Sequence, residues 1–260
     1  MNYTDRQIEL LIEGVFSGRF NPSYELPEDL YFAIADYLKK GLYKGFGATL
    51  ADVDFNSPDY ALLSELRNNV YMFSGAKTYQ QVREMSELLT EYKTFSDFAK
   101  QAREIYQQYN ENWLQSEYNT SIGQAQQAQQ WLQFEQGKEQ FPYLRYIAVM
   151  DSNTSEICRP LNGVTLPVGH ALWNKYSPLN HFNCRCVLEK LSKYDDVEPT
   201  KEGAVKKVEK ELNETVQPEF KMNPGKDGYI FSDKHPYFTV AKKDKGFARD
   251  NFGLPIPEKD

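Results

Sequence analysis

Apolar residues recur at helical spacing through most of the first 140 residues, which predicts a helical N-terminal region. Thr4 and Gln7 have the spacing of a capping box, so a helix is expected to begin there. Pro27, followed by two acidic residues, predicts the start of a second helix, and Pro58 predicts the start of a third. The same periodicity predicts further helices over residues 79–89 and 96–109.

The longest helix is expected to begin near Glu111 and to end before Gly137 and Pro142. One of its faces is an apolar stripe, and the others are rich in glutamine. The stripe contains Leu114, Tyr118, Ile122, Ala125 and Leu132, and the glutamines are Gln124, Gln126, Gln127, Gln129, Gln130 and Gln133. We predict that the glutamines form a solvated face, with a partner surface as the alternative.

After Pro142 the pattern changes to short runs of β-branched and aromatic residues separated by turn residues. Strands are predicted over residues 143–150, 164–166 and 186–191, followed by a charged helix over 202–216. The last 40 or so residues contain several prolines and predict an irregular arm that wraps its own domain or a neighbour. We therefore predict an α+β fold with three parts: a helical N-terminal region (1–110), a small mixed α/β domain (111–216) and an extended C-terminal arm (217–260).

Charge is distributed unevenly along the chain. Residues 1–150 contain 13 basic and 20 acidic residues, whereas residues 151–260 contain 17 of each. An acidic front half is unfavourable for sequence-independent DNA binding, which leaves residues 201–210 as the local basic patch. No run of about 18 apolar residues is present, and the N-terminus lacks a signal pattern, so we expect a cytoplasmic protein with no membrane partner.

All three cysteines lie in one window that also contains a histidine. Cys158 opens the window, and His181, Cys184 and Cys186 close it at spacings that can bring soft ligand atoms together. One interpretation is a structural zinc site with these four ligands. The alternatives are thiols packed as small apolar residues, a disulfide, or a catalytic thiol paired with histidine. An odd number of cysteines excludes a fully paired disulfide framework.

Polar residues beside the cysteines suggest local structure rather than catalysis. Asp151 and Thr154 follow a predicted strand, where a side-chain-capped turn is the simplest explanation. Arg185 alternates with the two cysteines around it, so it is expected to point away from them, and Asp151 is its candidate partner. His170 and His235 are expected to be ordinary surface or core histidines.

Several of these residues belong to a longer pattern. It comprises the run from Phe141 to Asp151, then Thr154, Cys158, Gly163 and Trp173, and the run from His181 through Asn183, Cys184 and Arg185 to Cys186. This pattern resembles the phage Mu protein F family of minor head proteins. A later run from Phe220 through Asn223 and Gly225 to Lys226 also looks like a family motif. The resemblance covers about residues 105–230.

The resemblance implies a low-copy, non-enzymatic protein of the capsid interior or portal region in tailed phages and prophages. Its implied role is capsid assembly, with assistance in DNA packaging or delivery. Its implied partners are portal and major capsid proteins, with at most weak contact with packaged DNA. Its implied locations are the host cytoplasm during assembly and then the virion head. The resemblance assigns no catalytic residue. The alternative function is a Cys/His-dependent enzyme or a toxin-associated module.

Overall fold

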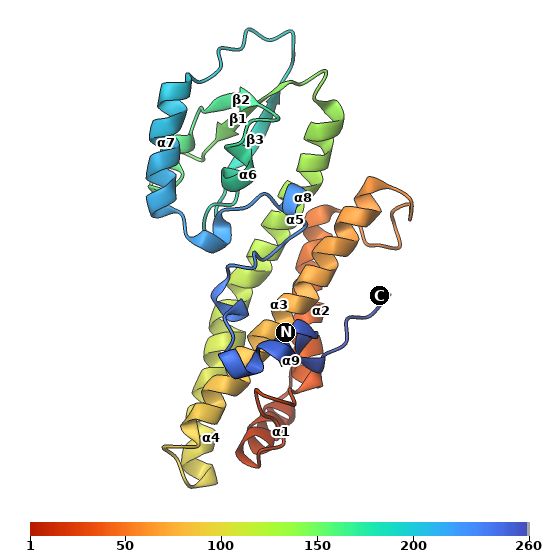
Figure 1. Cartoon of the computed structure of the whole chain (residues 1–260), viewed down its shortest axis with the longest axis vertical. Coiled ribbons are helices and arrows are strands. Elements are labelled where there is room, and N and C mark those ends of the chain that lie inside the picture. The colour runs from red at the N-terminus through yellow and green to blue at the C-terminus, as the bar shows by residue number, and fades with distance from the viewer. Residues whose placement is uncertain (259–260) are drawn as a thin grey trace. The chain divides into compact units, whose positions relative to one another are not determined.

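The computed structural model describes residues 1–258 and has an α+β fold (Figure 1). A helical N-terminal region is followed in the sequence by a small domain with a three-stranded antiparallel sheet. The helices are α1 (Asp5–Phe16), α2 (Glu28–Phe46), α3 (Pro58–Leu88), α4 (Phe95–Gln107), α5 (Leu114–Gly137), α6 (Trp173–Tyr176), α7 (Glu202–Thr215), α8 (Pro224–Asp227) and α9 (Lys245–Arg249). The strands are β1 (Tyr143–Ile147), β2 (Thr165–Pro167) and β3 (Val187–Leu191), and the π-helical stretch η1 (Gln108–Trp113) joins α4 to α5.

The chain forms two compact units, each built from separate stretches of sequence. Unit 1 comprises Met1–Gly41, Arg67–Tyr118 and the residues from Asp233 onward, and unit 2 comprises Leu42–Leu66 and Asn119–Ser232. The boundaries of these two units differ from those of the three predicted parts, 1–110, 111–216 and 217–260. The three parts stay a prediction of domain organisation. Among residues 1–258, no helix combines the length and apolar character needed to cross a lipid bilayer.

The first helices begin where the sequence predicts. Thr4 and Gln7 form the capping box of α1, in which each side chain hydrogen-bonds to the backbone N–H of the other residue. Helix α2 begins directly after Pro27, and α3 begins at Pro58. Proline suits these positions because the first turn of a helix does not need its N–H.

The prediction that the longest helix begins near Glu111 is wrong. Helix α3 has 31 residues and α5 has 24, and α3 continues without a break through the separately predicted segment 79–89. Its second half buries polar side chains, including Ser74, Lys77, Thr78 and Gln81, so the apolar periodicity is interrupted although the helix is not. Hydrogen bonds inside unit 1 make this burial tolerable.

A buried ion pair lies at the centre of unit 1. The Lys77 ammonium contacts both carboxylate oxygens of Glu117 at 2.8 and 2.7 Å and donates to the Tyr109 carbonyl at 2.7 Å. Tyr237 donates its hydroxyl to the same carboxylate at 2.9 Å. Burial lowers the pKa of Lys77, whereas the negative charge of Glu117 acts in the opposite direction. Lys77 and Glu117 are therefore stabilised by each other.

The C-terminal residues pack against unit 1, to which they belong. Gln80 donates its side-chain N–H groups to the carbonyl oxygens of Tyr237 and Thr239, each at 2.8 Å. Tyr79 donates to Asp244 at 2.8 Å, and the Tyr31 hydroxyl donates to the Pro255 carbonyl at 2.7 Å. The later part of the predicted arm, from Asp233, therefore packs against helices of unit 1 and hydrogen-bonds with α3, whereas residues 217–232 belong to unit 2.

Unit 2 is built around the sheet, in the order β2-β1-β3. Leu144 and Tyr146 of β1 point into the core, and the alternate residues Tyr143, Arg145 and Ile147 are partly exposed. Helix α7 lies beside the sheet in Figure 1, and its Val205 and Leu212 join the same apolar cluster. Trp131 of α5 and Trp173 of α6 complete this core. The predicted strands and charged helix are confirmed, although β1 ends three residues earlier than expected.

The glutamine-rich faces of α5 are only partly solvated. Gln126 and Gln133 are exposed, as predicted, whereas Gln124 is 1% exposed and Gln127 is 7% exposed. The prediction of a solvated face is therefore wrong for these two residues. An amide side chain is uncharged and can be buried at lower cost than an ion, so glutamine is a weaker indicator of exposure than lysine or glutamate.

We predict that the Lys77–Glu117 pair is energetically coupled. Replacing either residue alone, by Lys77→Met or Glu117→Leu, should cost roughly 3–5 kcal/mol because it leaves the other charge buried and unpaired. The double variant should lose much less than the sum. Urea denaturation of the four proteins measures the coupling, with Arg6→Ala, which breaks an exposed pair with Glu9, as a control of small effect. Additive losses would contradict the prediction.

Candidate functional site

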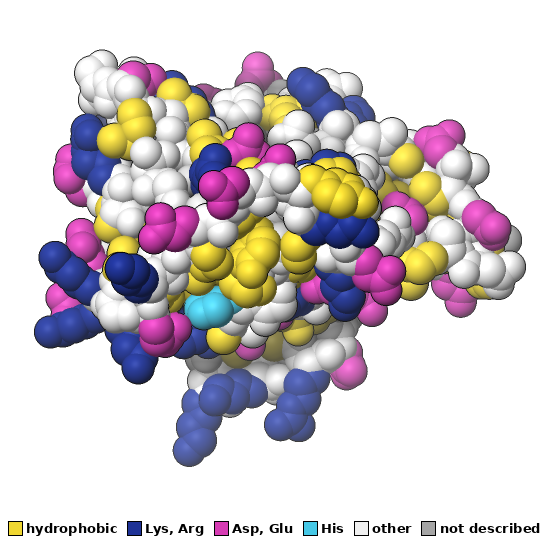
Figure 2. All heavy atoms as spheres, turned by 90° about the horizontal axis from the view of Figure 1, so that it is seen from above, with side chains coloured by type: hydrophobic (Ala, Val, Ile, Leu, Met, Phe, Trp, Pro, Cys, Tyr) yellow, Lys and Arg dark blue, Asp and Glu magenta, His cyan; other side chains and the backbone are white. Residues whose placement is uncertain are grey.

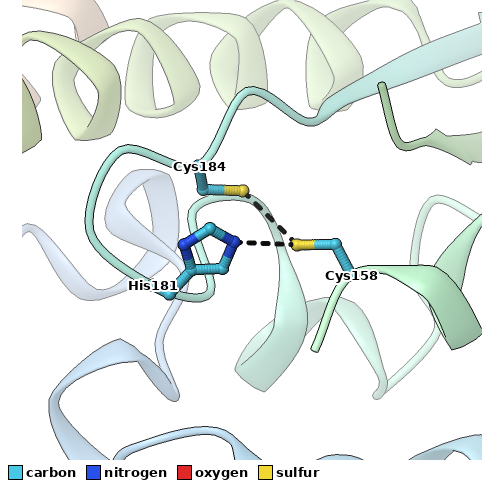
Figure 3. A group of neighbouring side chains, drawn as sticks. All are labelled: Cys158, His181 and Cys184. Atoms are coloured by element: carbon cyan, nitrogen blue, oxygen red, sulfur yellow. Dashed lines mark hydrogen bonds between the residues drawn. The ribbon is translucent and has the colours of Figure 1, made fainter. Parts of the chain in front are cut away.

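Two loops of unit 2 bring three of the four predicted metal ligands together. Cys158 lies just before the short helical turn Arg159–Leu161, whereas His181 and Cys184 lie in the loop that leads into β3. The Cys158 sulfur is 3.3 Å from His181 Nε2 and 3.7 Å from the Cys184 sulfur. The three side chains point toward one another (Figure 3), and their ligand atoms all lie within 4.8 Å.

Hydrogen bonding determines which His181 nitrogen faces the sulfurs. His181 Nδ1 lies 2.8 Å from the carbonyl oxygen of Phe182, which accepts a hydrogen bond only if Nδ1 carries the proton. In this tautomer the lone pair of Nε2 faces Cys158. A backbone carbonyl that orients the far nitrogen is typical of histidine ligands to metals.

The fourth predicted ligand, Cys186, is buried beside this group but is not part of it. Its side chain interacts with those of Cys158, Cys184 and Tyr146, although its sulfur lies outside the set of ligand atoms within 4.8 Å. Cys186 is two residues beyond Cys184 and adjoins the start of β3. The structure therefore shows three converging ligand atoms and a nearby third thiol.

The surroundings of the three thiols shift their pKa values in different directions. Side-chain hydrogen bonds from Cys158, Cys186 and His181 lower the pKa of the Cys184 thiol. Side-chain hydrogen bonds with Cys184 and then with Cys186 raise the pKa of the Cys158 thiol, because in both of them Cys158 holds the proton. The pKa of His181 is raised, first by its hydrogen bond with Cys184 and against the effect of burial. Cys184 is thus the thiol that most readily becomes a thiolate, which is the form that binds metals.

The cavity at this cluster is very small. It has a volume of about 20 Å³ and is lined by residues that include Cys158, His181, Asn183 and Arg185. A single water or ion needs roughly 10–15 Å³ by this kind of measure. The space therefore accommodates one ion or water molecule, whereas a small-molecule pocket usually has hundreds of Å³.

Arg185 and Asp151 form the predicted ion pair, and its geometry is bidentate. Arg185 Nη1 and Nη2 lie 2.8 and 2.7 Å from the two Asp151 carboxylate oxygens. Asp151 also accepts the backbone N–H of Asn153 at 2.9 Å and donates its own N–H to the Thr154 hydroxyl at 2.7 Å. Thr154 in turn donates to the Val149 carbonyl. The predicted side-chain-capped turn is confirmed, and Arg185 connects this turn to the cysteine loop.

The other predicted motif residues have packing and backbone roles. Trp173 is fully buried and donates its indole N–H to the Pro167 carbonyl at 3.0 Å. Asn223, also fully buried, donates to the Trp173 carbonyl at 3.0 Å and caps α8. At Gly225 a Cβ atom would lie 2.4 Å from Trp131 Cβ, so no side chain fits there. Gly163 and Asn183 have φ values of 81° and 57°, in the left-handed region where these two residue types are most easily accommodated.

Sequence analysis missed two residues that support the cluster. Tyr146 donates its hydroxyl to the Cys158 sulfur at 3.9 Å, and Asn180 donates to that hydroxyl at 3.0 Å. Burial, together with the nearby cysteines, raises the pKa of Tyr146. The inward position of Tyr146 follows from the alternation of side chains along β1. Its contact with Cys158 depends on loop conformations, which the hydrophobic pattern of a sequence does not predict.

The Asp151–Arg185 pair predicts a specific titration. Side-chain hydrogen bonds from Arg185, followed by the backbone N–H of Asn153, lower the pKa of Asp151 from 3.8 to about 2. A lowered carboxyl pKa favours the folded state above pH 3.8, and this contribution is lost as the pH falls from 3.8 to about 2. In Arg185→Ala the pKa of Asp151, followed by NMR of its carboxyl carbon, should rise toward 3.8.

Arg159→Ala is a suitable control for this titration, because Arg159 pairs with Glu156 on the neighbouring turn. It should leave the pKa of Asp151 unchanged. An Asp151 pKa that is the same in Arg185→Ala as in the native chain would refute a role for this pair.

Known proteins match the part of the chain that carries the cluster. Residues 80–189 match the family model described as Phage Mu protein F like protein. The Mu-like prophage FluMu F protein of Haemophilus influenzae is 30% identical over 104 residues, which cover 36% of this chain and 25% of that protein. No solved structure matches this chain significantly. The match contains β1, β2 and the first three residues of β3, together with Cys158, His181, Cys184 and Cys186, whereas Asn223 and Gly225 lie beyond it. Residues 80–189 of this chain are therefore similar to the Phage Mu protein F-like family.

Proposed function

We propose that this chain is a minor protein of phage or prophage heads that acts in capsid assembly, and that its cysteine cluster holds a structural zinc ion. The match of residues 80–189 to the Phage Mu protein F-like family is the observation that supports a head protein. The chain spans about a quarter of the length of its Haemophilus relative, so the role of the whole protein is part of the proposal.

The spacing of the three ligand atoms supports zinc. A tetrahedral zinc ion with bonds of about 2.3 Å to sulfur and about 2.0 Å to nitrogen holds its ligands roughly 3.5–3.8 Å apart. The sulfur–nitrogen and sulfur–sulfur distances of 3.3 and 3.7 Å at Cys158 are close to these values. Cys186 is the candidate for the fourth ligand. A site closed by four protein ligands would stabilise the fold without binding substrate.

Thiol catalysis is the alternative function, because the lowered pKa of Cys184 beside His181 is also a feature of cysteine nucleophiles. Two observations favour the structural role. The cavity of about 20 Å³ has no room for an organic substrate beside Cys158 and His181, and the cavity of about 260 Å³ that Cys184 lines has no histidine or carboxylate among its described lining residues. His181 Nδ1 faces the Phe182 carbonyl, and the nearby carboxylate, Asp151, is occupied by Arg185. We therefore propose that the chain is not an enzyme and that it contains no toxin-type active site.

The proposed partners are portal and major capsid proteins, and any contact with packaged DNA is expected to be weak. Acidic and basic side chains lie next to one another over most of the face in Figure 2, although several basic ones gather at its lower left. On α7 the basic Lys206, Lys207 and Lys210 alternate with four glutamates. Mixed charge of this kind gives little attraction to phosphates. The proposed locations are the host cytoplasm during assembly and the virion head.

Metal content tests the zinc proposal. Native mass spectrometry of the reduced, tag-free chain should detect one zinc ion per chain, and His181→Ala should abolish it. His170→Ala is the matched control, because His170 lies outside the cluster. Loss of the ion should lower the free energy of unfolding by several kcal/mol, on the order expected for structural sites. A metal-free chain in which Cys184 reacts rapidly with iodoacetamide would contradict zinc and favour thiol chemistry.

Head association is tested separately in a host that carries the chain with its neighbouring phage genes. Heads purified after induction should contain the chain at low copy number, and deletion of its gene should reduce the yield of complete heads. Asp151→Ala, which alters an exposed ion pair, should retain incorporation if its fold is intact. Normal heads that lack the chain would refute an assembly role whatever the metal content.

A further inference from the structure

Strand β3 is at the edge of the sheet in unit 2, and the hydrogen-bond pattern identifies its unpaired groups. The Tyr146 N–H donates to the Val164 carbonyl at 2.9 Å, and the Tyr146 carbonyl accepts the Gly163 N–H at 2.8 Å. The backbone polar groups of Tyr146 therefore face β2. Because successive residues alternate, those of Arg145 and Ile147 face β3 on the other side.

This pattern determines which residues of β3 have free backbone groups. Arg145 is opposite Glu189, and Ile147 is opposite Val187, so Glu189 and Val187 exchange hydrogen bonds with β1. The N–H and C=O groups of Leu188 and Lys190 consequently point to the outer edge. Within residues 1–258 these groups have no hydrogen-bond partner.

Lysine often protects an edge strand, but Lys190 is directed elsewhere. Its ammonium lies 4.6 Å from the centre of the Phe141 ring, on a face of the sheet. A charge held over a ring in this way blocks an approaching strand less than one that extends beyond the edge. The side chain of Lys190, an exposed residue, therefore does not block the outer edge of β3.

A cavity of about 260 Å³ lies at the start of this edge. Its walls are the segment Cys184–Val187 and a row of glutamines on α5, including Gln127 and Gln130. Gly123 forms part of the lining, where a Cβ atom would lie 2.9 Å from Leu179. The Gln130 side-chain oxygen is buried without a hydrogen-bond partner. Such an atom is costly unless another molecule supplies the missing donor.

The charge of the cavity indicates what kind of molecule it can bind. Arg185 is its one charged lining residue within the described chain, and both of its terminal nitrogens are bound to Asp151. The lining is therefore electrically balanced and rich in amide groups, each of which has a donor and an acceptor. A peptide backbone offers the same pair of groups, whereas a phosphate or nucleic acid needs unpaired positive charge.

We propose that the outer edge of β3 and the glutamine row of α5 bind one extended, uncharged segment of a partner protein as a fourth strand of the sheet. The backbone of this segment hydrogen-bonds with Leu188 and Lys190, and its end lies in the cavity beside the side chain of Gln130. Strand addition of this kind derives affinity from backbone hydrogen bonds and specificity from the adjoining pocket. The inference goes beyond the proposed head and zinc roles, and its test uses the purified chain alone.

The probe is a library of random linear peptides displayed on filamentous phage and selected on the full-length chain. Enriched peptides should be uncharged, with β-branched or aromatic residues at alternate positions. On binding, amide hydrogen exchange measured by NMR should slow at Leu188 and Lys190, while Val187 and Glu189 should change little because their N–H groups already bond to β1. Failure to enrich any peptide, or protection elsewhere, would overturn the proposal.

Variants at the edge distinguish strand pairing from other binding. Lys190→Pro removes an outward N–H without removing a bond to β1, a position that an edge strand tolerates. It should weaken peptide binding about tenfold or more, and Lys190→Ala, which loses the same ammonium, should not. Circular dichroism confirms that the variants are folded.

A second pair of variants keeps the test decisive if Lys190→Pro does not fold. Gln130→Ala should preserve stability, because the Gln130 oxygen has no partner in the free chain, and should weaken binding severalfold. Gln133→Ala, an exposed residue on the same helix outside the cavity, should have no effect. Equal binding by Gln130→Ala and Gln133→Ala would overturn the role of the glutamine row.

Discussion

The cost of burying polar groups is the constraint on which both units depend. In unit 1 a fully buried lysine is stable because Glu117 and the Tyr109 carbonyl surround its ammonium. In unit 2 the buried Asn223 connects α8 to the Trp173 carbonyl, and the indole of Trp173 connects in turn to Pro167. The Lys77–Glu117 and Asn223–Trp173 bonds join residues that are 40 and 50 positions apart, so satisfying polar groups also determines the topology.

The same constraint explains what the sequence could predict. The α1 capping box and the turn around Asp151 were predictable because their partners are three or fewer residues apart, so spacing alone specifies the contact. The Arg185–Asp151 pair was predicted from the alternation of side chains along an extended segment, and it is present although Arg185 lies in the loop before β3. In these cases local geometry is sufficient.

Tertiary partners account for what was missed. Lys77 and Gln81 look like surface residues in the sequence, and only Glu117 and Asn110, many residues away, make their burial favourable. The sequence therefore predicted two helices, one from Pro58 and one over residues 79–89, where the structure has the single helix α3. The burial of Gln124 and the contact of Tyr146 with Cys158 likewise depend on segments that periodicity does not relate. The three converging ligands were predicted by residue type, whereas the more distant place of Cys186 required the structure.

One short segment connects the cysteine cluster with the open edge of the sheet. Cys184 contacts Cys158, Arg185 binds Asp151, and Val187 begins the strand whose outer groups are unpaired. A metal ion at the cluster would hold this segment by one end, while β1 holds it by the other. An edge that is fixed before a partner arrives loses less conformational entropy on binding than a mobile one. The soft ligands can therefore contribute to recognition by fixing the segment Cys184–Val187, which forms one wall of the cavity proposed for the peptide.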